Sequence, residues 1–237
     1  MRFFFNSVFL LFFFIHCSAF HQTNASSENR EQRDLAQALP SVALQEKDFR
    51  SYYSDEFPNT EWSFADSCIE LKSQGFGGDL MTRKRYLNFE ATFKMEINEG
   101  MNSGFLFQVQ EGAQYSYLTG LEIQLLHDSS HPDGRQPLTA HGSLYGLSPA
   151  NSFAKSQIAW SEKWHHFKVK VVDENLEFWM NGVLLNSSSL TNEFLEPLIA
   201  NSKFKNFQNF NKKKEGHLLF QNHGSDFKVC DLAIISL

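Results

Sequence analysis

The chain has 237 residues, with 21 Lys and Arg against 27 Asp and Glu, so its formal net charge is −6. This acidic balance argues against a nucleic-acid-binding protein, which needs a basic face to displace counterions from phosphate. Hydrophobic residues make up 42% of the chain and charged residues 20%. That composition is typical of a globular protein and excludes a largely disordered one.

The N-terminus resembles an export signal. Arg2 is the only charged residue before Glu28, and an apolar run covers residues 8–15. The run is too short to span a membrane, which takes about 20 apolar residues. We therefore predict a signal peptide over residues 1–19, and an exported protein that is periplasmic, secreted or membrane-anchored. The alternative processing is that of a lipoprotein, cut before Cys17 and lipid-anchored there.

A polar segment poor in aromatic residues follows, over residues 20–46. We predict a flexible linker here, with a short helical turn at Asp34–Leu39 ahead of Pro40. The folded domain is then expected to cover residues 47–237.

Within that domain the apolar residues recur with a period of two. Residues 87–97 show eleven positions of strict alternation between apolar and polar side chains, which predicts a half-buried strand. Further strand-like segments cover residues 103–110, 120–127, 164–172, 176–185, 216–224 and 227–237. Many short strands separated by turn signals predict an all-β sandwich or barrel.

Two local signals refine this pattern. Asn181-Gly182 is a signal for a two-residue hairpin turn of type I′. A single short helix is expected within residues 189–200, ended by Pro197.

The chain has three cysteines, and Cys17 lies in the predicted signal peptide. Cys68 and Cys230 lie in the first and last strand-like segments. In an exported protein they either form a disulfide or remain two buried free thiols. No Cys/His spacing typical of a zinc site is present.

Alternation also separates candidate site residues from core residues. Glu122, Gln124 and Asp128 share one face of their strand, opposite Leu121 and Ile123. In the penultimate strand the shared face carries His217, Leu219, Gln221 and His223. A curved sheet offers a groove in which such polar side chains hold a sugar.

Each of these residues has a plainer interpretation. Glu122 is either a base or a solvent-facing strand residue, and His223 is either a proton carrier near neutral pH or a partly exposed ring. His127 and His131 are four residues apart, but Pro132 beside them favours a loop, so a metal site there is the minor alternative. The lysine-rich residues 201–215 are expected to form a solvated loop, with a polyanion site as the alternative.

Seven motifs in a fixed order resemble one known family over residues 48–237. They are GGDLMT (77–82), RYLNFEATFKM (85–95), NSGFLFQ (102–108), LEIQLLHD (121–128), HGSLYGL (141–147), FWMNGV (178–183) and GHLLFQNHG (216–224). The family is that of the 3-keto-disaccharide hydrolases, formerly a domain of unknown function. The resemblance implies a concanavalin A-like jelly-roll sandwich of two antiparallel sheets.

The resemblance also implies an activity, which is cleavage of the glycosidic bond of 3-keto-glycosides, by elimination and then hydration. It makes Glu122 and His223 the candidates for acid and base catalysis. The substrate-binding candidates are Asp79, Asn102, Gln124, Asp128, Tyr145 and Gln221. The expected partner is a carbohydrate, no cofactor is specified, and a divalent metal stays open.

This sequence departs from the family pattern at three places. Met81 replaces a tryptophan, Gln108 replaces an arginine, and Val229-Cys230-Asp231 replaces Phe-Arg-Asn. The lost arginines either change the substrate or abolish activity. The alternative function is therefore a non-catalytic carbohydrate-binding module. A laminarinase-like hydrolase is disfavoured, because Glu122 supplies only the first carboxylate of the Glu-x-Asp-x-x-Glu pattern such an enzyme uses.

Overall fold

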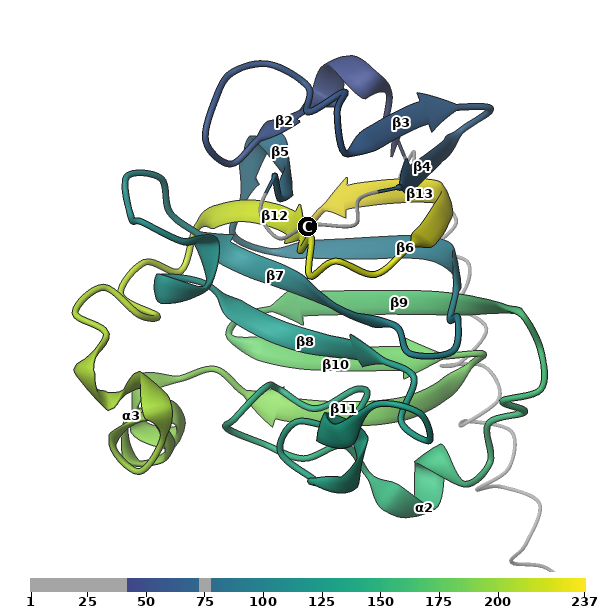
Figure 1. Ribbon diagram of the computed structural model, residues 1–237. Helices are drawn as coiled ribbons and strands as arrows, with labels where there is room; N and C mark the ends of the chain where they lie inside the picture. The colour runs from purple at the N-terminus through teal and green to yellow at the C-terminus, as the bar shows by residue number, and fades with distance from the viewer. Residues whose placement is uncertain (1–41, 73–77) are drawn as a thin grey trace, which may run out of the picture. The chain divides into compact units, whose positions relative to one another are not determined.

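The computed structural model describes residues 42–72 and 78–237 (Figure 1). The predicted signal peptide, the anchor at Cys17 and the helical turn at 34–39 lie outside these residues. The strands of the described part are β1 (Val42–Ala43), β2 (Phe49–Ser51), β3 (Trp62–Ala65), β4 (Cys68–Leu71), β5 (Leu80–Tyr86), β6 (Phe89–Glu96), β7 (Asn102–Val109), β8 (Leu121–Leu126), β9 (Trp164–Val172), β10 (Asn175–Met180), β11 (Val183–Ser189), β12 (Gly216–Phe220) and β13 (Phe227–Ser236).

Helical structure is confined to short elements between the strands. The α-helices of the described part are α2 (Ser152–Lys155) and α3 (Asn192–Ala200), and the 3-10 helices are η1 (Glu46–Asp48), η2 (Ser116–Leu118), η3 (Pro132–Arg135) and η4 (Lys203–Asn206). In the described ranges no helix is long and apolar enough to cross a membrane.

The strands pair antiparallel in two sheets. The larger sheet has the order β11-β10-β9-β6-β13-β4-β3, with β1 added beside β13, and the smaller sheet has the order β2-β5-β12-β7-β8. Phenylalanines join the sheets, since the ring of Phe93 in β6 stacks on Phe105 in β7 at 5.8 Å and meets Phe220 in β12 edge-on at 5.4 Å. The predicted all-β sandwich of two antiparallel sheets is confirmed.

The period of two in the sequence arises because successive side chains of each strand point alternately into the core and away from it. In β6 every second side chain is buried, beginning with Phe89. The hairpin between β10 and β11 turns at Asn181 and Gly182, which have φ angles of 50° and 79°. Positive φ at both central residues is what a type I′ turn requires.

Two predicted boundaries are corrected. The predicted helix exists, but α3 continues past Pro197 to Ala200. The proline removes one backbone bond, and the packing of Leu195, Leu198 and Ile199 on the core holds the helix together. The sheet also begins inside the segment predicted as a linker, because β1 already pairs with β13.

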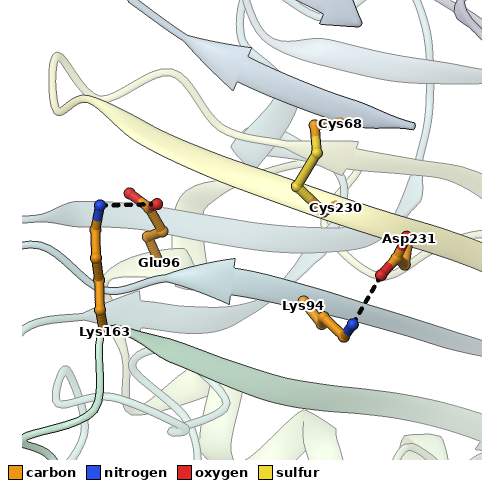
Figure 2. Close-up of a disulfide and its surroundings, with 6 residues drawn as sticks. All are labelled: Cys68, Lys94, Glu96, Lys163, Cys230 and Asp231. Atoms are coloured by element: carbon orange, nitrogen blue, oxygen red, sulfur yellow. Dashed lines mark ion pairs between the residues drawn. A yellow bond between two sulfur atoms is a disulfide. The ribbon is translucent and has the colours of Figure 1, made fainter. Parts of the chain in front are cut away.

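The first and last parts of the domain are joined covalently. Cys68 in β4 lies directly opposite Cys230 in β13, and the two form a disulfide (Figure 2). Of the two states left open by the sequence, the structure has the bridge. Two ion pairs drawn in the same view, Lys94–Asp231 and Lys163–Glu96, each have an N···O distance of 3.0 Å. Such surface pairs contribute little to stability.

Candidate functional site

A cavity of about 650 Å³ opens on the outer face of the smaller sheet. This face is set by strand parity, because Leu121, Ile123 and Leu125 of β8 point into the core between the sheets. The cavity is lined by Tyr53, Asp79, Asn102, Tyr115, Tyr117, Glu122, Gln124, Asp133, Tyr145, Lys203, Phe204, Gln221, Asn222 and His223. Its volume is that of a site for a small molecule, such as one or two sugar rings.

Glu122 is the most perturbed acid of this cavity. Burial raises the pKa of its carboxyl to about 7, Asp79 and Asp133 add to the rise, and the charge of Lys203 opposes it. No described residue donates a hydrogen bond to the carboxylate. A carboxyl group with such a pKa exists as acid and as base near neutral pH, which suits proton transfer.

Space for this side chain is provided by Gly104 in β7. Gly104 pairs with Gln124, one alternation step along β8 from Glu122. A Cβ built on Gly104 would lie 2.8 Å from both Cγ and Cδ of Glu122. The absence of a side chain at Gly104 is therefore what allows the Glu122 carboxyl to occupy its place.

Asp79 lies buried just before β5 and is held by two donors. The Ser116 hydroxyl donates to Oδ2 at 2.5 Å, and the backbone N–H of Asn222 donates to Oδ1 at 2.9 Å. Burial raises the pKa of Asp79, while these two bonds and the nearby His223 lower it. Asp79 thereby connects η2 to the segment that follows β12.

An amide chain crosses the floor of the cavity. Gln124 Nε2 donates to Asn102 Oδ1 at 2.7 Å. The Nδ2 of Asn102 lies 3.4 Å from His223 Nδ1 and 3.4 Å from His131 Nε2. An amide NH2 only donates, so in the tautomer that accepts this bond at Nδ1 the His223 ring carries its proton on Nε2.

Lys203 supplies the positive charge of the opposite wall. Its ammonium lies over the ring of Tyr145, 4.1 Å from the ring centroid. Burial lowers the pKa of Lys203, while the charges of Glu122 and Asp133 raise it. The positive charge of Lys203 therefore interacts with the carboxyl group of Glu122, whose ionisation burial disfavours.

Most of the residues predicted from the sequence meet in this cavity. They are Asp79, Asn102, Glu122, Gln124, Tyr145, Gln221 and His223. The seven come from β7, β8, the residue before β5, the segment after β12 and the loop after β8. Their catalytic and binding roles stay predictions.

Asp128 is the exception. It pairs with Lys155, and its Oδ1 accepts the backbone N–H of His141 at 2.8 Å. The alternation that placed Asp128 beside Gln124 fails because β8 ends at Leu126. Asp128 holds the 127–141 loop against α2 and does not line the cavity.

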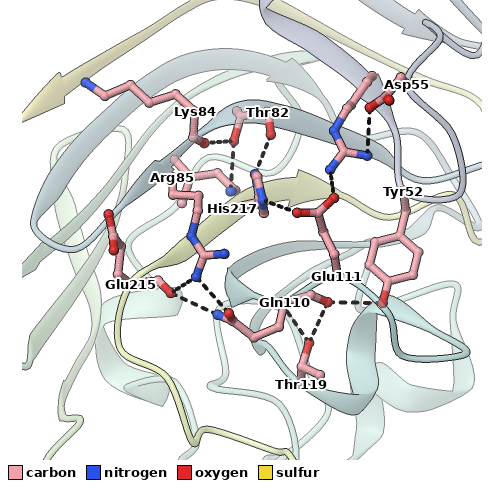
Figure 3. A network of polar contacts seen from close by, with 12 residues as sticks. Tyr52, Asp55, Thr82, Lys84, Arg85, Gln110, Glu111, Thr119, Glu215 and His217 are labelled. Atoms are coloured by element: carbon pink, nitrogen blue, oxygen red, sulfur yellow. Dashed lines mark hydrogen bonds and ion pairs between the residues drawn. The ribbon is translucent and has the colours of Figure 1, made fainter.

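His217 keeps the outer face predicted for it, since its cross-strand partner Val109 packs there with Leu106 and Leu219. It is buried outside the cavity, where Nδ1 lies 2.7 Å from the carbonyl oxygen of Thr82 and Nε2 lies 3.5 Å from Glu111 (Figure 3). The pairing of β12 with β5 and β7 is irregular between His217 and Leu219. The extra residues of this irregularity lie in β5 and β7, so the alternation along β12 is kept.

Sequence reasoning missed the residues that loops bring to the cavity. These are Tyr53, Tyr115, Tyr117, Asp133, Lys203, Phe204 and Asn222. The sequence predicts a solvated loop around Lys203. The residue is indeed exposed, but it also lines the cavity. The one signal available was the run of tyrosines around Tyr115.

The three departures from the family pattern lie elsewhere. Met81 packs with Leu106 and Leu219 in a small cluster on the outer face. Gln108 is buried and Cys230 is in the disulfide, and neither lines the cavity. None of the residues now at these three positions lines the cavity.

The described histidines are not grouped into a metal centre. Across residues 42–72 and 78–237, no three His, Cys, Asp or Glu side chains are grouped so as to hold a metal ion. His131 Nδ1 accepts the backbone N–H of Asp133, and His127 Nδ1 lies 2.5 Å from Ser130 Oγ. Each ring thus has a contact within its own loop, and His131 also lies next to Asn102 of β7.

Comparison with known proteins agrees with the motifs. A curated relative, the 3-keto-disaccharide hydrolase of Bacteroides thetaiotaomicron, is 26% identical over 208 aligned residues, which cover 75% of this chain and 70% of the relative. A solved structure from Parabacteroides distasonis, described as a "putative glycosyl hydrolase", has a TM-score of 0.72 at 25% identity and covers 82% of this chain and 91% of its own. A second such structure from that organism, at 16% identity and a TM-score of 0.59 over 80% of this chain and 99% of its own, shares the fold.

The model of one family, described as the 3-keto-alpha-glucoside-1,2-lyase-like domain, matches residues 44–234. The match spans both sheets and every strand of the cavity floor. The resemblance seen in the sequence motifs is thus confirmed, and this chain belongs to the family of 3-keto-alpha-glucoside-1,2-lyase-like domains.

Proposed function

We propose that this domain cleaves the glycosidic bond of 3-keto-glycosides by elimination followed by hydration. Family membership and the name of the Bacteroides relative support a hydrolase that acts on glycosidic bonds. The polar floor and the size of the cavity suit one oxidised sugar ring and part of its leaving group.

A ketone at C3 makes the hydrogen on C2 acidic. A base removes that proton, the C1–O bond breaks, and a double bond forms between C1 and C2. The leaving oxygen takes up a proton and departs as an alcohol. Water then adds across the double bond, with its oxygen on C1 and a proton on C2, to give the free 3-keto sugar. The sum is one glycosidic bond hydrolysed by one water.

In this scheme Glu122 removes the C2 proton. Its side chain is half-buried in the cavity, burial raises its pKa to about 7, and no hydrogen bond ties it to a described residue. Lys203, across the cavity, donates to the C3 oxygen as negative charge develops there. His223, held through Nδ1 by Asn102, presents its Nε2 proton to the leaving oxygen.

The single observation that carries the proposal is the place of Glu122. Ordinary glycosidases work with two carboxylates and an oxocarbenium-like transition state. Of the three carboxyl groups that line this cavity, Asp79 is held by two donors, whereas Glu122, whose pKa is raised to about 7, shares the cavity with an ammonium group and an imidazole. That set suits removal of an acidic C–H better than stabilisation of a cationic sugar.

The test is to incubate the purified domain in D2O with an aryl 3-keto-glucoside and, separately, with its unoxidised parent. The expected result is release of the phenol from the keto compound alone, with one deuterium at C2 of the product. Glu122→Gln should slow release by about 10² or more, the usual contribution of a general base.

Two outcomes would overturn the proposal. Comparable release from the unoxidised parent would indicate an ordinary glycosidase. Binding without release, with EDTA and with added divalent cations alike, would indicate the carbohydrate-binding module.

We also propose that the protein is exported. The disulfide supports this, because structural disulfides persist in oxidising compartments. Mass spectrometry of the protein from its own cell should find the first 17–19 residues removed. Labelling with a radioactive fatty acid would separate a Cys17-anchored lipoprotein from a soluble form, and an intact N-terminus on a cytoplasmic protein would contradict export.

A further inference from the structure

Side chains from four segments meet at one amide on the cavity floor. The amide nitrogen of Asn102 lies 3.4 Å from Nε2 of His131, in the loop after β8, and 3.4 Å from Nδ1 of His223, in the segment after β12. The other end of this amide contacts the Gln124 amide of β8 at 2.7 Å. Asn102 is buried and His223 is exposed. Asn102 therefore links a buried polar chain to the ring that is proposed to act on the substrate.

The proton of the His131 ring is placed by its own loop. The backbone N–H of Asp133 donates to Nδ1 of His131 at 3.2 Å, and this bond caps η3. A backbone N–H only donates, so Nδ1 of His131 presents a lone pair and the single proton of the neutral ring is on Nε2. The His131 nitrogen that faces Asn102 is therefore a hydrogen-bond donor.

This donor decides which end of the Asn102 amide suits the histidines. With Nδ2 on that side, the Nε2–H of His131 meets an NH2 group, and a donor faces a donor. Half a turn of the amide exchanges its two ends with almost no change of shape, and Oδ1 then accepts from His131. The bond to Gln124 is kept if the Gln124 amide turns as well, because each amide has one donating and one accepting end.

The turned amide also places the proton of His223. A carboxamide oxygen has two lone pairs, so Asn102 Oδ1 accepts from Nε2–H of His131 and from a proton on Nδ1 of His223. The His223 ring then keeps its Nδ1 proton in the neutral and in the protonated form. Only Nε2 of His223 gains and loses a proton.

We propose that His131 is a positioning residue, which turns the Asn102 oxygen toward His223 and thereby reserves Nε2 of His223 for proton transfer. The catalytic part of this inference rests on the proposed function. In that reaction the protonated His223 ring gives its Nε2 proton to the leaving oxygen as the C1–O bond breaks, and becomes neutral with a proton on Nδ1. The same Nε2 then takes a proton from the water whose oxygen bonds to C1, while Glu122 returns its proton to C2.

The opposite direction of the amide would not support this cycle. A His223 ring whose Nδ1 accepts from the Asn102 NH2 is neutral and has its proton on Nε2. Loss of that proton to the leaving oxygen would leave an imidazolate anion. The direction of one buried amide therefore decides whether His223 is able to act as acid and base in turn.

The ring protons are located by long-range proton–nitrogen NMR of the histidine-labelled protein, at a pH high enough to leave both rings neutral. We expect the Nε2–H form for His131 and the Nδ1–H form for His223 in the absence of substrate. The Nε2–H form of His223 would overturn the proposal. The measurement needs no turnover, so it tests the amide direction even if no 3-keto-glycoside is cleaved.

His131→Asn tests the positioning role. Asparagine is a favourable N-cap residue, so its side-chain oxygen should keep the bond from the Asp133 N–H and the shape of the loop. The variant lacks the Nε2–H that requires an acceptor, so Asn102 takes either direction and His223 should become a mixture of tautomers. With a 3-keto-glycoside, kcat should fall about tenfold, a part of the usual contribution of a general acid. KM should hardly change, because His131 does not line the cavity.

His127→Asn is the matched control, because it changes a histidine of the same loop whose ring contacts Ser130. It should leave the His223 tautomer and kcat unchanged. A His223 tautomer that is also unchanged in His131→Asn would overturn the positioning role.

Two variants of Asn102 test the amide itself. Asn102→Asp offers acceptors on both sides, so it should keep the Nδ1–H form of His223, whereas the opposite amide direction predicts a change from Nε2–H to Nδ1–H. Asn102→Leu removes the acceptor and should give His223 mixed tautomers. A tautomer of His223 that differs between the wild-type protein and Asn102→Asp would overturn the proposal.

Discussion

The Cα of Gly104 in β7 lies beneath the Glu122 carboxyl of β8, so close that a Cβ on Gly104 would stand 2.8 Å from Glu122 Cδ. Neighbouring strands normally carry a side chain at every position of a shared face. Here the position of Gly104 carries no side chain, and the half-buried Glu122 carboxyl fills the space. The position of the proposed base thus depends on a residue without a side chain.

Gly104→Ala should therefore displace the Glu122 carboxyl without unfolding the domain, because the clash is with the end of a flexible side chain. A shift of the order of 1 Å in a reacting group costs about 10² in rate. We expect kcat to fall by about that factor while the melting temperature changes little. Both are measured on the same preparation with a 3-keto-glucoside.

Gly100→Ala provides the control for this variant. Gly100 has a φ of 76°, and nothing lies within 4 Å of a Cβ built on it. The alanine there should reduce stability by about 1 kcal/mol through backbone strain and leave kcat intact. If Gly104→Ala and Glu122→Gln lowered kcat additively in the double variant, the two residues would not act on the same step.

The pH dependence of activity follows from the pKa of Glu122. A base works when deprotonated, and burial raises the pKa of this carboxyl to about 7. We expect kcat/KM to fall tenfold per pH unit below about pH 7, instead of below the usual range of a glutamate. The residual activity of Glu122→Gln should lack this acidic limb. A limb that persists in the variant would assign the titration to another group.

The same pKa predicts that stability falls as pH rises, whereas activity increases. Because the folded state holds the Glu122 proton up to about pH 7 and the unfolded state releases it near 4.5, stability is lost as pH rises through this window. Glu122→Gln should remove the loss and raise the free energy of unfolding at pH 8 by roughly 1–3 kcal/mol relative to its effect at pH 4. Urea denaturation at both pH values measures this, and an equal effect at both would contradict it.

The strands and the floor of the cavity could be predicted from the sequence because both follow from the alternation of side chains along a strand. A period of two places Glu122 and Gln124 on one face and Leu121, Ile123 and Leu125 on the other. The rule works while the strand continues. It stops at Leu126, and this is why Asp128 was wrongly placed beside Gln124.

The walls of the cavity follow no such rule. Tyr115, Tyr117 and Lys203 belong to loops, and their positions depend on contacts with distant parts of the chain, such as the pairing of Glu111 with Arg50. No local pattern encodes those contacts. The state of Cys68 and Cys230 was undecidable for a related reason, since it depends on the register that sets β4 against β13.

Cys68 and Cys230 are 162 residues apart, so their disulfide closes most of the domain into one loop. Loss of such a constraint on the unfolded chain costs about 2–5 kcal/mol. Reduction, or the double variant Cys68→Ser/Cys230→Ser, should therefore lower the free energy of unfolding by that amount. Neither cysteine lines the cavity, so kcat well below the melting temperature should not change. The double variant should be insensitive to dithiothreitol; equal stability of oxidised and reduced wild-type protein would contradict a structural role for the bridge.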